Sequence, residues 1–306
     1  MRLALMTWPE VESYLARSTG ILVPIGSTEQ HGPNGLLGTD AICPETVAHL
    51  VGEAVGAAVA PTLAVGMSQH HMAFPGSITL RPSTFLQVVR DVVESLARHG
   101  FDRVYFLNGH GGNIAPLQTA FSEIWAAGTA ARAVLGAGEM RVEGVPGSVP
   151  AARAVLGAGD PRTEGMPGSM PSASPVPGPR DPLAERLPGS MPVARPLRLR
   201  QRNWWSGERV AALQKELFGA ADGSHATASE VSLSWFAHPD AVRRVEMSPR
   251  IAPSGPIRDA EDFRRRFPDG RIGSDPSLAT VEAGEKLCAA AVEDVREDYV
   301  RFLEDA

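Results

Sequence analysis

The sequence predicts a single α/β domain of three layers, in which a central, mostly parallel sheet is flanked by helices. Short apolar runs that end at or near a glycine are the first indication, because they are typical of strands buried on both faces. The second is that a polar or glycine-rich loop and then a helical pattern follow these runs. In sheets of this class, ligands bind beyond the carboxyl ends of the strands.

Four segments are expected to form strands of this sheet. Residues 20–26 (GILVPIG), 57–65 and 103–107 (RVYFL) are apolar and have the length of a strand. The alternating segment at 195–205 (RPLRLRQRNWW) is expected to be the next strand along the chain.

Three helices are expected between these strands. The first begins after Pro44, since proline is favoured in the first turn of a helix. Residues 83–99 carry apolar side chains at helical spacing, and Gly100 follows them as a C-terminal cap would. The third helix follows the NGHGGN segment at 108–113 and is expected to run through Ala127.

Residues 131–194 form a low-complexity insert with a repeat of 21 residues. The pentapeptide PGSVP at 146–150 returns as PGSMP at 167–171 and at 188–192. Solenoids also repeat at such periods, but their repeats carry a regular apolar face, whereas Pro, Gly, Ser and Ala dominate these units. We therefore expect a tandem duplication that forms a flexible surface insert within one domain over residues 1–306.

Composition and charge exclude several classes of protein. The net charge of −6 and the pI near 5.8 argue against a nucleic-acid partner, because phosphate binding needs a basic face. No apolar run approaches the roughly 20 residues of a membrane helix, and the N-terminal segment lacks the features of a signal peptide. Cys43 and Cys288 lack the spacing of a metal knuckle and suit a reducing compartment. The expectation is a cytoplasmic protein with no nucleic-acid or membrane partner.

Glu29, His31 and Asp40 follow the first expected strand and form the clearest candidate site. Carboxylate and imidazole groups are the ligands that suit zinc, manganese or iron. In an extended loop Glu29 and His31 point the same way, because side chains alternate with a period of two. Asp40 can then return to complete a shared metal site. The alternative is a polar turn with an aspartate that caps the following helix.

The segment 108–113 follows another expected strand and offers a second group of candidates. At the start of a helix, the N–H groups of Gly111, Gly112 and Asn113 would stabilise negative charge that develops on a substrate. His110 is a candidate metal ligand, although its position alone is equally compatible with a structural role. A phosphate-binding loop is disfavoured, because the Lys–Ser/Thr pair of that motif is absent.

Four further side chains carry weaker patterns. His225 and Glu230 lie five residues apart beside the apolar VSLSW segment, where a cap and a solvated helix face would be the alternative to a functional pair. His71 precedes a turn at 74–77 that could close over a pocket, so it is a candidate for substrate contact or proton relay, or part of an ordinary loop. Trp204 could form the wall of a substrate pocket or pack in the core.

Together these segments resemble the creatininase (creatinine amidohydrolase) family. The resemblance rests on four blocks in the same order: PIGSTEQHGPNGLLGTDAICPE at 24–45, FPGSITL at 74–80, NGHGGN at 108–113 and HATASEVS at 225–232. It implies a creatininase-like α/β fold with a centre of two divalent metal ions, zinc, manganese or iron. It also implies a homo-oligomer, often a hexamer of paired subunits in this family.

The resemblance further implies a role for each candidate side chain. Glu29 and His110 would hold one metal ion, His31 and Glu230 the other, and Asp40 would bridge the two. His225 would act in catalysis as a proton shuttle. The implied reaction is hydrolysis of a C–N bond in an amide or cyclic amide, with a metal-bridging hydroxide as the nucleophile.

The chain departs from creatinine-cleaving members of the family at Gly111 and Gly112, where those enzymes are expected to have a bulky residue and a glutamate. The expected substrate is therefore a small amide other than creatinine. Relatives similar at these glycines include a ribosylaminopyrimidine deformylase and a peptidase that trims a redox-cofactor precursor. The competing hypotheses are a catalytically inactive binding protein on this fold and a flavodoxin-like nucleotide binder, which the missing phosphate-loop lysine disfavours.

Overall fold

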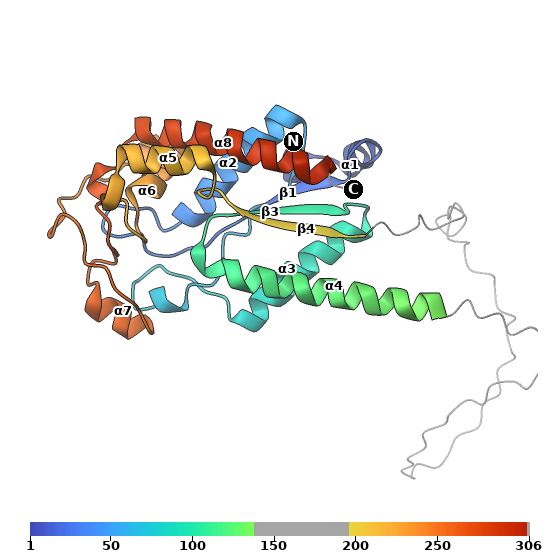
Figure 1. The fold of residues 1–306 in the computed structure, drawn as a ribbon, viewed down its shortest axis with the longest axis horizontal. Helices are drawn as coiled ribbons and strands as arrows, with labels where there is room; N and C mark the ends of the chain where they lie inside the picture. The colour runs from blue at the N-terminus through green and yellow to red at the C-terminus, as the bar shows by residue number, and fades with distance from the viewer. Residues whose placement is uncertain (138–195, 305–306) are drawn as a thin grey trace, which may run out of the picture. The chain divides into compact units, whose positions relative to one another are not determined.

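The computed structural model describes residues 1–137 and 196–304, and Figure 1 shows how their elements are arranged. The described parts of 1–131 and 195–306 belong to one compact unit. The expected repeat insert lies outside the described residues, apart from a few residues that end a helix. The single-domain organisation and the flexible insert therefore stay predictions.

Among the described residues, the centre of this unit is a parallel sheet of four strands in the order β2-β1-β3-β4. Its strands are β1 (Gly20–Ile25), β2 (Ala58–Val59), β3 (Arg103–Asn108) and β4 (Arg198–Asn203). The two middle strands, β1 and β3, pair along their whole length. Since β2 lies on one side of β1 and β3 on the other, the strand order changes direction between β1 and β3.

Helices cover both faces of the sheet, which confirms the expected α/β class (Figure 1). One face carries α2 (Thr39–Val55), α5 (Glu208–Leu217), α6 (Ala228–Ala237) and α8 (Val281–Glu304), and the other carries α1 (Trp8–Leu15), α3 (Pro82–Arg98) and α4 (Ile114–Ala137). The short α7 (Ala260–Arg266) packs against the single 3-10 turn at Gln69–His71. The other single 3-10 turns are Leu3–Leu5, Gly111–Asn113, Gly219–Ala221, Pro239–Ala241 and Pro276–Leu278. None of the described helices is long and apolar enough to cross a membrane.

Alternation along the middle strands sends apolar side chains into both helical layers. In β1, Ile21 and Val23 pack against the layer of α1, α3 and α4, whereas Leu22 packs against the opposite layer. In β3, Phe106 and Tyr105 divide in the same way. Burying one apolar side chain of this size stabilises the fold by roughly 1.5–3 kcal/mol. A shift of the register by one residue would turn each of these side chains to the opposite face of the sheet. The register is therefore strongly specified, and with it the residue at which each loop leaves the sheet.

β2 is much shorter than the strand expected at 57–65, and two prolines explain the difference. The N–H groups of Ala60 and Leu63 donate hydrogen bonds of 2.8 and 3.0 Å to β1, but Pro61 between them has no N–H. Pro24 in β1 also lacks an N–H. Its carbonyl accepts the bond from Leu63 and so points toward β2, and an N–H on the same residue would have pointed to the same side. The ladder therefore lacks one donor on β1, and the donors that reach β1 from the other side, Ala60 and Leu63, are three residues apart rather than two, with Pro61 between them.

α2 begins at Thr39, whereas the sequence predicted a start after Pro44. Because Pro44 has no N–H, the carbonyl of Asp40 has no donor one turn further along the helix. This carbonyl lies instead against the ends of β1 and β3, where a Cβ on Gly26 or Gly109 would come within 2.0 or 1.9 Å of it. Only glycine fits at these two positions, and the close approach places Asp40 beside the loops that follow both strands.

α4 ends at Ala137, beyond the expected end at Ala127. Residues 128–137 (GTAARAVLGA) are rich in alanine, contain leucine and arginine, and have no proline, so their composition favours a helix. The first copy of the repeat therefore starts within a helix.

Gly109→Ala is expected to destabilise the fold, because its Cβ would meet the backbone of Asp40 and neither partner can yield. Overpacking of this severity costs about 3 kcal/mol or more. Gly128→Ala in α4 is the matched control, since its Cβ meets nothing within 4 Å and alanine in a helix is more stable than glycine by roughly 0.5–1 kcal/mol. Thermal unfolding followed by circular dichroism compares the variants. A Gly109→Ala protein as stable as its parent would contradict the close approach.

Candidate metal centre

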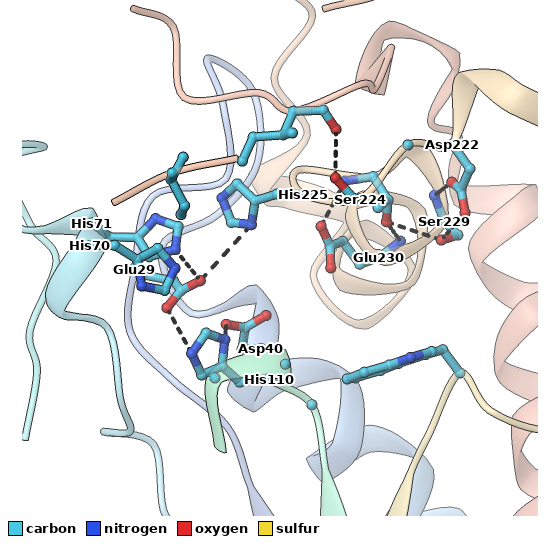
Figure 2. A pocket seen from close by; sticks show the side chains of 18 of the residues that line it. Glu29, Asp40, His70, His71, His110, Asp222, Ser224, His225, Ser229 and Glu230 are labelled. Atoms are coloured by element: carbon cyan, nitrogen blue, oxygen red, sulfur yellow. Dashed lines mark hydrogen bonds and ion pairs between the residues drawn. The ribbon is translucent and has the colours of Figure 1, made fainter. Parts of the chain in front are cut away.

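The candidate site lies at the edge of the sheet where the strand order changes direction, as expected for this fold class. Glu29 lies in the loop after β1, and His110 lies directly after β3. Asp40 is in the first turn of α2, and Glu230 is in the first turn of α6. Figure 2 shows these side chains and His225 around one pocket.

The carboxylate of Asp40 lies between two imidazoles. Its Oδ1 is 3.0 Å from Nε2 of His31, and its Oδ2 is 3.0 Å from Nδ1 of His110. The side chain does not cap α2, because the N-cap residue is Gly38 and no side chain caps that end. Asp40 therefore connects the loops after β1 and β3 rather than serving as the helix cap that was the alternative.

Glu29 is 1% exposed and has four polar side chains around it. Ser68 Oγ donates a hydrogen bond of 2.5 Å to Oε2, and Nε2 of His110 lies 3.4 Å from the same oxygen. The other oxygen, Oε1, has Nε2 of His71 at 3.0 Å and Nδ1 of His225 at 4.0 Å. Histidines from three distant segments thus converge on this carboxylate, as Figure 2 shows.

Glu230 takes part in a helix cap and also faces the cluster. Its Oε1 accepts a hydrogen bond of 2.6 Å from the N–H of Thr227, whose Oγ1 accepts one of 3.1 Å from the N–H of Glu230. This reciprocal pair is a capping box at the start of α6. The same Oε1 lies 3.9 Å from Nε2 of His31. The cap that the sequence offered as an alternative is present, and it does not turn the carboxylate away from His31.

Buried charges of opposite sign support one another in this cluster. Burial raises the pKa of Glu29, but the facing imidazoles, His110 first, outweigh burial and lower it to about 2. Burial lowers the pKa of His31, but Asp40 and Glu230 outweigh it and raise the pKa to about 10. The pKa of His110 is raised to about 9 against burial by Glu29 and Asp40. The carboxylate of Glu29 is thus ionised beside positive charge.

The pKa values of two other members of the cluster, His225 and Glu230, shift in the opposite direction. Burial, together with repulsion from His31 and His71, holds the pKa of His225 well below its usual value, so its imidazole is neutral. Burial raises the pKa of Glu230 to about 7, although His31 opposes this shift. Titratable groups whose environments push their pKa values apart are typical of functional sites.

Backbone carbonyls orient the two imidazoles that contact Asp40. The Nδ1–H of His31 donates a hydrogen bond of 3.0 Å to the carbonyl of Glu29, which leaves Nε2 toward Asp40. The Nε2–H of His110 donates a bond of 3.0 Å to the carbonyl of Met67, which leaves Nδ1 toward Asp40. Imidazoles that bind metal ions are oriented in this way by a hydrogen bond from their other nitrogen.

The residues present fit a divalent cation. Three groups have ligand atoms within 4.8 Å of one another: Glu29, Asp40 and His110; His31, Asp40 and Glu230; and Glu29, His31 and His225. Among the described residues, no donor reaches Oε1 of Glu29 or Oδ2 of Asp40 with hydrogen-bond geometry, although imidazole nitrogens lie near both. Buried oxygens without a donor are costly unless a cation lies beside them. Carboxylate and imidazole ligands suit zinc, manganese or iron.

The pocket beside this cluster has a volume of about 480 Å³. Gly111 and Gly112 line it. Trp204 also lines the pocket, although it is 2% exposed and packs in the core.

Asn113 lies differently from its expected place near a substrate. Its N–H donates to the carbonyl of His110 at 3.2 Å, and its side-chain amide donates to the carbonyl of Gly26 at 2.9 Å. Its side-chain oxygen accepts a bond of 3.1 Å from the N–H of Met67. Asn113 therefore braces three backbone segments around the site, and this corrects its assignment as an oxyanion donor, because its N–H is already engaged.

Gln30, Ser68 and Phe263 belong to the site, although they were not predicted. Ser68 binds Glu29, and Phe263 of α7 lines the pocket. The side-chain amide of Gln30 lies near His71 and His225 rather than near the adjacent candidate ligand His31. Its position within the Glu29–His31 motif was a usable signal. An isolated serine and a phenylalanine in a short helix carry none.

The profile of the family described as Creatininase, creatinine amidohydrolase, matches residues 4–298 of the chain. The chain belongs to the creatininase family. The resemblance seen in the sequence is thus confirmed.

Curated relatives of this creatininase-family chain differ in the substrates that their names give. Creatinine amidohydrolase of Pseudomonas putida is 35% identical over 111 residues, which are 34% of this chain and 43% of the relative. Mycofactocin precursor peptide peptidase of Mycolicibacterium smegmatis is 39% identical over 106 residues, 33% of this chain and 42% of the relative. 3-Dehydro-scyllo-inosose hydrolase of Thermotoga maritima is 32% identical over 107 residues, which are 35% of this chain and 34% of the relative. The chain spans less than half of the length of these relatives.

Solved creatininase structures share the fold. A manganese creatininase aligns with a TM-score of 0.69 at 21% identity over 99% of each chain. A zinc–zinc form of a creatininase variant aligns with a TM-score of 0.68 at 20% identity over 99% of this chain and 98% of the other. These neighbours therefore support the creatininase-like architecture that the sequence predicted.

Gly112→Ala is expected to weaken metal binding, because its Cβ would lie 2.3 Å from Nε2 of His110 and 2.7 Å from the carbonyl oxygen of Met67. Displacing an oriented imidazole typically costs about 10–100-fold in metal affinity. The neighbouring Gly111→Ala is the matched control for metal affinity, since its Cβ meets nothing within 4 Å. Competition with a chromophoric chelator for zinc or manganese measures the affinity. Equal affinities of the two variants would contradict the expected displacement of His110.

Proposed function

We propose that the chain is a hydrolase that uses two divalent cations to cleave a C–N bond in an amide or cyclic amide. The observation that carries this proposal is that five ligand-type side chains from distant segments form two compact groups that share Asp40. Membership of the creatininase family supports hydrolysis. The manganese and zinc forms of structural neighbours support a role for divalent cations.

In this proposal Glu29, Asp40 and His110 would hold one cation, and His31, Asp40 and Glu230 would hold the other. Divalent cations bound there would supply Lewis acidity and lower the pKa of water toward neutrality. The distances of 3.0 Å from the Asp40 oxygens to His31 and His110 support this division, because each oxygen serves a different imidazole.

The remaining residues would position the substrate and move protons. The N–H groups of Gly111 and Gly112 would donate to negative charge on the carbonyl oxygen, and a lost donor of this kind typically costs roughly 10²–10³ in rate. His225 would accept a proton and deliver it to the leaving nitrogen, since it lies at the edge of the cluster and lines the pocket. His71 would hold Glu29 in place, and Trp204 would form part of the pocket wall.

We infer that the substrate is an amide other than creatinine. The two adjacent glycines lack the bulky residue and the glutamate expected in creatinine-cleaving members of the family, and a side chain at Gly111 would meet nothing within 4 Å. A peptide is the second candidate, which this open space and the 39% identity with the mycofactocin precursor peptide peptidase favour. A formamide, as in a deformylase, is a further alternative. Homo-oligomeric assembly, as a hexamer, and a cytoplasmic location stay predictions.

Asp40→Asn and His110→Ala are each expected to remove metal and activity while the protein still folds. Asn cannot supply two anionic oxygens, and Ala removes an imidazole that contacts Asp40 and Glu29. Elemental analysis of the purified protein should give close to two metal equivalents per chain for the parent and for the exposed control Asp91→Asn. Full turnover in either site variant would contradict the proposal.

A screen of cyclic ureides, lactams, formamides and short peptides with manganese or zinc is expected to yield turnover in one class. A chelator should abolish this turnover, and added metal should restore it, because the cations supply the chemistry. If a protein that binds two cations turns over none of these classes, a catalytically inactive binding protein becomes the better explanation.

A further inference from the structure

Gln30 is a buried amide in contact with two histidines that are not ligands in the proposed centre. Its Nε2 lies 3.1 Å from Nδ1 of His71 and 2.9 Å from Nε2 of His225. Both imidazoles point toward Glu29, as Figure 2 shows. Neutral imidazole has two tautomers, and the hydrogen bond at one nitrogen determines what the other offers.

The amide of Gln30 has one favourable orientation. Its Oε1 accepts a hydrogen bond of 2.9 Å from the N–H of Gly32, and its Nε2 donates one of 3.0 Å to the carbonyl of Gly270. Exchanging the two atoms would set oxygen against oxygen at Gly270 and two N–H groups against each other at Gly32. The NH₂ group therefore faces the histidines, and one of its two protons is used at Gly270.

The backbone carbonyl of Gln30 determines the tautomer of His225. This carbonyl lies 2.8 Å from Nε2 of His225 and can only accept, so Nε2 carries the proton. The close contact of Nε2 with the amide nitrogen of Gln30 is then not a hydrogen bond. Nδ1 of His225 keeps its lone pair and faces the cluster, 4.0 Å from Oε1 of Glu29.

The side chain of Gln30 determines the tautomer of His71. The amide proton that Gly270 does not use has Nδ1 of His71 as its remaining acceptor, so Nδ1 is unprotonated. The proton of His71 is therefore on Nε2, which lies 3.0 Å from Oε1 of Glu29. The other tautomer would place a lone pair against an anionic oxygen.

We propose that Gln30 is a positioning residue that gives His71 and His225 opposite tasks. Its side-chain amide sets the tautomer of His71, and its backbone carbonyl sets the tautomer of His225. His71 presents an N–H toward the carboxylate of Glu29 at an ion-pair distance of 3.0 Å, and His225 presents a lone pair to the pocket. The importance of Glu29 rests on the proposed function. The assignment of the tautomers rests on hydrogen bonds alone.

The direct test is a long-range ¹H–¹⁵N correlation spectrum of the full chain with labelled histidine, recorded with zinc or after chelator treatment. At about pH 8, above the usual histidine pKa of about 6.5, neutral tautomers are distinguished by their nitrogen shifts. Resonances are assigned by their loss in His71→Gln and His225→Gln. We expect the proton on Nε2 in both residues. A proton on Nδ1 of His71, alone or in an imidazolium, would overturn the proposal, as would one on Nδ1 of His225.

Gln30→Met separates the two halves of the proposal, because it removes the side-chain amide and keeps the backbone carbonyl. We expect the Nδ1 resonance of His71 to shift, because this nitrogen loses its hydrogen-bond donor, while the resonances of His225 are unchanged. Affinity for zinc in chelator competition should fall about tenfold, as for other partners of ligand side chains. Gln118→Met on the exposed side of α4 is the matched control and should leave both readouts unchanged. An unchanged His71 spectrum in a folded Gln30→Met protein would refute the side-chain half.

This spectrum needs no substrate, so the two proposals fail separately. Expected tautomers in a protein without hydrolytic activity would leave the positioning role intact and contradict only the proposed function. If Gln30→Met does not fold, the spectrum of the parent protein still decides between the tautomers.

Discussion

The carboxylate of Asp40 depends on a backbone contact that only glycine allows. Pro44 leaves the carbonyl of Asp40 without a helical donor, and Gly26 and Gly109 let this carbonyl lie against the ends of β1 and β3. The start of α2 is thereby brought to the place where the sheet reverses its order. The loops after β1 and β3 supply histidines at this same place, so a constraint on packing determines the geometry of the site.

The charges of the site are tolerable because they are arranged as neighbours of opposite sign. Moving an ion from water into a protein interior costs several kcal/mol, and attraction between partners repays this cost only at short range and with good geometry. Here the carboxylates of Glu29 and Asp40 face three imidazoles at 3.0–3.4 Å. Protons on His31 and His110 supply positive charge where a cation would. The cluster is thus suited to exchange protons for metal.

Local patterns were sufficient for the parts of the fold that depend on neighbours in sequence. Buried strands, helical periodicity and the polar loops after strands were visible, and so were Glu29, His31 and His110. The truncation of β2 was not visible, because it needs Pro24 and Pro61 on paired strands. The engaged N–H of Asn113 depends on a turn that composition does not define. Contacts between distant segments, such as Ser68 with Glu29, leave no local pattern.

Positions around the pocket differ in how closely they are tied to the fold. Glu230 closes the first turn of α6 and also faces His31, so any change there alters a helix and a charge together. Gly112 is confined by His110, whereas Gly111 has empty space beside it. An ancestral protein could therefore have acquired new substrates through residue 111 while its inherited scaffold stayed intact. Divergence within such a lineage would concentrate at positions that, like residue 111, have empty space beside them.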